Sequence, residues 1–125
     1  MGERYFFPKD KRLFLKKDID RLFDKGLSFV SYPLRIIYLP YMHDTSLKSG
    51  TSVLVSVPKK FIKSAVKRNR LKRLIRESFR LNISKQKERQ VHIAIMYISK
   101  EMRPYSAIEN ALLKALVIIS NKVEG

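Results

Sequence analysis

The chain of 125 residues has no cysteine, four glycines, two histidines and eleven acidic residues. Without cysteine it can form neither a disulfide bond nor a thiolate metal site. The few glycines build no glycine-rich phosphate loop. His43 and His92 lack the spacing of paired zinc ligands, and nothing points to a Ser-His-Asp arrangement. We therefore expect neither catalytic residues nor a metal site in the protein itself.

Long apolar runs are also missing. No stretch approaches 18 apolar residues, so no membrane span and no membrane partner are expected. The N-terminus is basic but lacks the apolar core of a signal peptide, which makes the cytoplasm the expected compartment. Hydrophobic residues still make up 45% of the chain. This content is typical of a globular domain rather than a disordered basic tail, and we interpret residues 1–125 as one domain.

Lysine and arginine are abundant: 27 basic against 11 acidic residues give a net charge of +16. Residues 59–89 hold thirteen basic and two acidic residues, and thus contribute +11 of this charge. A charge run is often only a solvated helix face. Acids are too scarce here, however, for pairing along a helix to balance the charge. The concentration indicates a polyanionic partner, most simply nucleic acid.

The basic stretch predicts a helix from about residue 64 or 65 to Leu81. A mainly apolar stripe recurs at helical spacing, and basic residues occupy the other faces. The stripe consists of Leu71, Leu74, Ile75, Ser78 and Phe79. Such a helix packs one face on a core and presents the rest to an anion.

The remaining elements follow from breakers and periodicity. Residues 1–15 are interpreted as an extended arm, and Asp18 is predicted to cap a short helix that ends at Gly26. Pro33 divides the next segment into a short strand and a longer one at about 34–39. Further strands are predicted at 53–57 and 91–98, the latter in the centre of the sheet because it is the most hydrophobic.

A final helix is predicted to begin at a capping box of Ser106 and Glu109 and to run to about Lys122. Its apolar stripe is Ile108, Ala111, Leu112, Ala115, Leu116 and Ile119. The element order αβββαβα predicts an α+β fold, a two-layer α/β sandwich with a four-stranded sheet. General principles favour a right-handed crossover between the strands that flank the basic helix, if these are parallel.

The run from Arg68 to Glu77, RNRLKRLIRE, resembles the RNR signature of the protein subunit of bacterial ribonuclease P. Four further segments resemble the same family in the same order, which makes the match specific. They are Phe7-Pro8-Lys9 with Arg12-Leu13, Asp18 to Gly26, Val57 to Lys60, and Ala65-Val66. The resemblance implies a left-handed crossover at the signature helix, and we adopt this topology over the general preference.

The resemblance also implies a function. Proteins of this family bind ribonuclease P RNA and precursor tRNA, and assist RNA-catalysed endonucleolytic removal of the 5′ leader. The RNA subunit carries the chemistry with bound Mg²⁺, so the protein alone is not expected to be catalytic or to need a small-molecule substrate. The signature helix in the family contacts the catalytic RNA and borders a cleft for the leader.

Position by position, the resemblance assigns two groups of residues. The RNA-binding group is Lys59, Lys60, Arg68, Asn69, Arg70, Lys72, Arg73, Arg76 and Arg80. The leader-binding group is Phe23, Tyr38, Lys72 and Arg76. Asn69 could instead cap the helix, and Phe23 could instead pack in the core. Two departures from the family are Ile19, where many members have Phe, and the absence of Gly between Lys60 and the signature.

Two other functions remain open from the sequence. The first is a structural or ribosomal RNA-binding protein without a role in cleavage, and stimulation of cleavage separates it from the ribonuclease P reading. The second is a DNA-binding module. It lacks a recognisable helix-turn-helix, because strands flank the basic helix.

Overall fold

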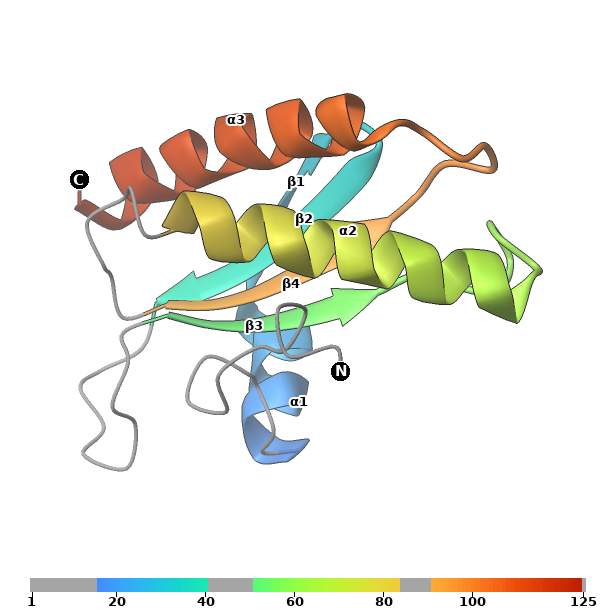
Figure 1. The fold of residues 1–125 in the computed structure, drawn as a ribbon. Coiled ribbons are helices and arrows are strands. Elements are labelled where there is room, and N and C mark those ends of the chain that lie inside the picture. The colour runs from blue at the N-terminus through green and yellow to red at the C-terminus, as the bar shows by residue number, and fades with distance from the viewer. Residues whose placement is uncertain (1–15, 41–50, 84–90, 125) are drawn as a thin grey trace.

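The computed structural model describes residues 16–40, 51–83 and 91–124, so the predicted arm at residues 1–15 lies outside the described residues. The chain has an α+β fold with the predicted order αβββαβα (Figure 1). The elements are α1 (Lys16–Lys25), β1 (Leu27–Ser31), β2 (Leu34–Pro40), β3 (Thr51–Ser56), α2 (Ala65–Ile83), β4 (Val91–Tyr97) and α3 (Tyr105–Glu124).

The four strands form one mixed sheet in the order β1-β2-β4-β3. Strands β1 and β2 are antiparallel, β2 and β4 are antiparallel, and β3 and β4 are parallel. Strand β4 therefore occupies the predicted central position. Helix α2 joins the two parallel strands and passes over the sheet from β3, nearest the viewer in Figure 1, to β4 behind it. The crossover is left-handed, as the family resemblance implied.

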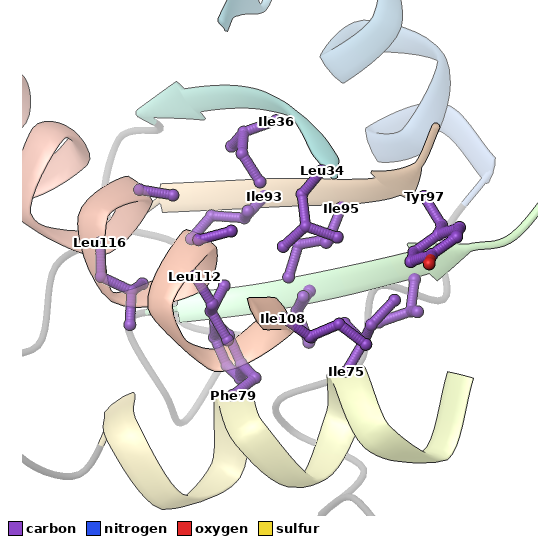
Figure 2. Packing of buried hydrophobic residues seen from close by; sticks show 14 of the residues in the cluster. Leu34, Ile36, Ile75, Phe79, Ile93, Ile95, Tyr97, Ile108, Leu112 and Leu116 are labelled. Atoms are coloured by element: carbon purple, nitrogen blue, oxygen red, sulfur yellow. The ribbon is translucent and has the colours of Figure 1, made fainter. Parts of the chain in front are cut away.

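The main core lies between the sheet and helices α2 and α3. Alternate residues of each strand point to this face, as the period of two requires. On β2 they are Leu34, Ile36 and Tyr38, all buried. Figure 2 shows Ile75 and Phe79 of α2 among the core side chains that pack beneath the sheet. The predicted stripes of both helices are buried, except that Leu74 is partly buried.

Helix α1 lies on the opposite face of the sheet (Figure 1). It buries Leu22 completely against Ala94, with Ile37 and Leu54 packed around this contact. The two-layer arrangement thus describes the sheet with α2 and α3, and α1 adds a small cover on the second face. A helix of ten residues is too short to cover all four strands, so α1 covers only part of this face.

The predicted helix caps at Asp18 and Ser106 are wrong. Helix α1 begins at Lys16, so Asp18 lies within it, and lysine is a good helix former that extends the helix backwards. Helix α3 begins at Tyr105, where the Pro104 carbonyl accepts the first hydrogen bonds of the helix. The predicted end of α1 at Gly26 is confirmed. Its N–H donates to the Leu22 carbonyl at 2.8 Å.

Candidate nucleic-acid interface

One continuous segment concentrates basic residues at one end of the molecule. Strands β3 and β4 are parallel, with Ser56 paired to Met96, so both end at the same edge of the sheet. The segment 57–64 follows β3 at that edge and leads into α2. We call this region the basic end. It is defined by Lys59, Lys60, Lys63, Lys67, Arg68 and Arg70, of which all but the partly exposed Arg68 are exposed.

A tight turn presents the lysines of this segment to solvent. The backbone N–H groups of Phe61 and Ile62 both donate to the Pro58 carbonyl, at 3.1 and 3.2 Å. Ile62 is buried in the main core, and the partly buried Phe61 packs against it. Because these apolar anchors point inwards, the neighbouring lysines point outwards. The ammonium of Lys60 lies 5.3 Å from the centroid of the Phe61 ring, which orients this charge further.

Arg68 fastens this turn to α2. One terminal nitrogen of its guanidinium donates to the carbonyls of Ile62, at 3.1 Å, and Lys63, at 2.8 Å. Ser64 caps the helix, because its Oγ accepts a hydrogen bond from the backbone N–H of Lys67 at 3.3 Å. Arg68 therefore has a structural task besides the predicted RNA contact. The turn contains no glycine, unlike the same turn in many family members. The contacts of Arg68 with the two carbonyls fix its conformation instead.

Helix α2 presents the signature residues on the sides away from its core stripe. Asn69, Arg70 and Arg73 are exposed, while Lys72 and Arg76 are partly exposed. Asn69 lies in the second turn of α2, so it does not cap the helix. Lys63 and Lys67 are exposed beside these residues. The family resemblance did not assign either lysine to the RNA-binding group. Their position in the same charge run is the signal that could have included them.

The far end of α2 carries less free positive charge. The guanidinium of Arg80 donates two hydrogen bonds to the Glu77 carboxylate, at 3.2 and 2.7 Å. This hydrogen bonding raises the pKa of Arg80 above its ordinary value. Because the pair is neutral as a unit, Arg80 is a weaker candidate for a phosphate contact than the arginines near the start of the helix.

The two aromatic residues predicted for the leader do not share a surface. Phe23 is 47% exposed on α1, so it does not pack in the core and its ring is available to a ligand. Tyr38 is 4% exposed and lies in the main core, with its ring centroid 5.9 Å from that of Phe29 in an edge-on contact. The next residue back, Ile37, faces α1 instead. Tyr38 therefore lies on the opposite face of the sheet from α1 and cannot contact the same ligand surface as Phe23.

Two further features of the described residues bear on function. Among residues 16–40, 51–83 and 91–124 there is no group of three or more His, Cys, Asp or Glu placed to hold a metal ion. In the same ranges, no helix combines the length and apolar character needed to cross a membrane.

Comparison with known proteins decides the family. The family model described as Ribonuclease P matches residues 7–120. The chain belongs to the ribonuclease P protein family. The Ribonuclease P protein component of Porphyromonas gingivalis is 42% identical over 121 residues, which cover 92% of this chain and 87% of the relative. That of Clostridium acetobutylicum is 35% identical and covers 83% of this chain and 84% of the relative.

Solved ribonuclease P proteins share the fold. The RNase P protein of Staphylococcus aureus superimposes with a TM-score of 0.69 at 25% identity, over 87% of this chain and 94% of the other. That of Thermotoga maritima gives a TM-score of 0.69 at 24% identity, over 84% and 94%. As a ribonuclease P protein, the chain serves tRNA 5′ processing within a ribonucleoprotein endoribonuclease, and its partner is ribonuclease P RNA.

Proposed function

We propose that the basic end and the adjoining face of α2 bind ribonuclease P RNA, and that the α1 side of the sheet receives the 5′ leader of precursor tRNA. The observation that carries the first part is the gathering of exposed lysines and arginines on a turn fixed by Arg68. A rigid array of cations binds phosphates with little loss of side-chain and loop freedom. Arg70 and Arg73 supply planar donors that suit phosphate oxygens.

The exposed ring of Phe23 supports the second part. A single-stranded leader offers unpaired bases, and bases of any sequence stack on an aromatic ring. Lys72 and Arg76 lie one helical turn apart on α2, across the sheet from Phe23, so in this proposal they supply charge for leader phosphates where the strand passes from the α1 side to the α2 side. The protein holds no catalytic group in this proposal. Hydrolysis and the Mg²⁺ that it needs belong to the RNA subunit, and the protein contributes affinity for substrate and for the folded RNA.

Reconstitution tests the proposal. Purified protein, ribonuclease P RNA and precursor tRNA are mixed at a Mg²⁺ concentration too low for the RNA alone, and release of the leader is measured. Stimulated release is expected. Lys72→Gln should reduce it, and Lys114→Gln on α3, an exposed lysine outside the basic end, serves as the matched control. Tight RNA binding without stimulation would instead favour a purely structural RNA-binding role.

The leader contact has its own test. Binding of precursor tRNA to the reconstituted enzyme is compared with binding of mature tRNA, which lacks the leader. Phe23→Ala should weaken precursor binding by about 5- to 150-fold, the range for one stacked base, and leave mature tRNA unaffected. Equal losses for both substrates would show that Phe23 does not contact the leader.

A further inference from the structure

Three segments that are distant in sequence meet at the same edge of the sheet. The turn between β1 and β2 lies there, because Leu34 at the start of β2 pairs with Tyr97 at the end of β4. The segment 98–104 follows β4, and the basic end follows β3. The N–H of Ile98 donates to the Pro33 carbonyl at 2.9 Å and joins the first two segments. Neighbouring strands are about 4.8 Å apart, so the turn lies roughly 10–15 Å from the end of β3.

An ordered pair of planar side chains occupies this turn. Tyr32 is 56% exposed, and the guanidinium carbon of Arg103 lies 5.2 Å from the centroid of its ring. A terminal nitrogen of Arg103 donates to the Tyr32 hydroxyl at 3.3 Å and lies 3.3 Å from the Glu101 carboxylate. Hydrogen bonding to Ser99, and then to Arg103, lowers the pKa of the Tyr32 hydroxyl from its ordinary value.

The support beneath this pair is rigid. The hydroxyl of the fully buried Tyr97 donates to the Glu101 carbonyl at 2.6 Å and accepts the backbone N–H of Arg103 at 2.9 Å. The buried Ser99 accepts the N–H of Glu101 at 3.1 Å. Two buried side chains thus fix the backbone of a segment that has no regular secondary structure. The exposed ring and the partly exposed guanidinium are thereby held in place at little further entropic cost on binding.

We propose that Tyr32 and Arg103 form a stacking site for an unpaired nucleotide of the RNA strand that binds the basic end. Unpaired bases stack on tyrosine rings and on guanidinium planes. Lys100, exposed on the same segment, supplies charge for the adjoining phosphate. Glu101 restrains Arg103 and partly offsets its charge, so the site favours stacking over phosphate binding. This inference rests on the RNA-binding function proposed above and extends its surface across the end of the sheet.

Substitutions at Tyr32 test the site through binding to ribonuclease P RNA at fixed salt. Tyr32→Phe keeps the ring and should bind within about twofold of the unsubstituted protein. Tyr32→Leu removes the stacking plane and should weaken binding by about 5- to 150-fold. The slope of log affinity against log salt should not change for either variant, because no charge is removed. Thermal unfolding of each variant confirms that the fold is retained.

Arg70→Gln, measured beside them, separates failure of this inference from failure of the proposed function. If Arg70→Gln weakens binding and Tyr32→Leu does not, the stacking site is refuted while the RNA-binding function stands. If neither variant weakens binding, the stacking site and the proposed RNA-binding surface are both refuted. Equal losses for Tyr32→Phe and Tyr32→Leu would assign the effect to the hydroxyl and overturn stacking. Should Tyr32→Leu unfold, a photo-crosslinking amino acid at position 32 decides: a crosslink to the RNA supports the site, and its absence rejects it.

Discussion

Neutralising Arg70 should weaken RNA binding more than neutralising Arg80, although both are arginines on α2. The structure gives the reason. Arg70 is exposed at the basic end, whereas Arg80 already donates two hydrogen bonds to Glu77. A phosphate that approached Arg80 would have to compete with this carboxylate or displace it. The two substitutions to Gln remove the same charge, so a difference between them reports the local pairing.

The expected size follows from counterion release. Each phosphate that a basic side chain neutralises contributes about 0.7 to 0.9 to the slope of log affinity against log salt. The basic end with Arg73 offers seven cations, so a slope between about −3 and −6 is expected if most of them reach phosphates. Arg70→Gln should make this slope shallower by about 0.7 to 0.9. Arg80→Gln should change it by less than about half of that amount.

The assay is equilibrium binding of labelled ribonuclease P RNA at five or more salt concentrations. Lys114→Gln on α3 is the matched control and should leave the slope unchanged. Equal changes for Arg70→Gln and Arg80→Gln would refute the idea that Glu77 neutralises Arg80. A flat salt dependence of the unsubstituted protein would refute the electrostatic interface altogether, because an array of exposed cations cannot bind a polyanion without releasing its counterions.

Three further substitutions test the supports of the interface. Gly26→Ala would place a Cβ 2.3 Å from the Leu22 carbonyl oxygen, a backbone atom, and should destabilise the fold by about 1–3 kcal/mol in urea unfolding. Asn82→Ala should cost about 1–3 kcal/mol in the same assay, since the buried amide donates to the Glu109 carboxylate at 3.0 Å. Arg68→Ala should increase proteolytic cleavage of the turn at residues 59–63, seen by limited trypsinolysis, because both carbonyl contacts are lost.

Each of these has a control of the same kind. Ser28→Ala, on the exposed side of β1, and Asn110→Ala, on the exposed side of α3, should change stability by less than about 0.5 kcal/mol. Arg68→Lys keeps the charge but loses the forked donor, so it should expose the turn nearly as much as Arg68→Ala does. If trypsin cleaves Arg68→Lys no faster than the unsubstituted protein, the guanidinium contacts do not hold the turn.

Local patterns were sufficient to predict the elements and most of the core. The apolar stripe of α2 and that of α3 recur at helical spacing, and both face the sheet. The central position of β4 followed from its being the most hydrophobic of the predicted strands. Pro33 marked the boundary of β1 and β2 because proline cannot continue a strand ladder. Each of these signals lies within one short segment, because helical periodicity, strand hydrophobicity and a proline break all depend on residues close together in the sequence.

The faces of β2 could not be assigned from sequence, and Tyr38 shows why. Strand β2 carries apolar residues on both faces, since α3 covers one and α1 part of the other, where only Arg35 is charged. Alternation groups Leu34 and Ile36 with Tyr38, but it does not say which helix covers which group. A leader contact shared with Phe23 requires the Tyr38 side chain to lie on the α1 face of the sheet. The structure places Ile37 on that face instead. The polar bond between Asn82 and Glu109 was equally hidden, because it joins residues 27 apart.

The parallel pairing of β3 with β4 explains why the binding surface forms at one edge. A parallel connection must run back along the sheet, so α2 begins where β3 ends, beside the end of β4. The antiparallel β2 begins at that same edge, which brings in the turn with Tyr32. The charge run at 59–73 was visible in the sequence because one segment supplies it. Tyr32 and Arg103 are 71 residues apart, so only the strand order makes them neighbours.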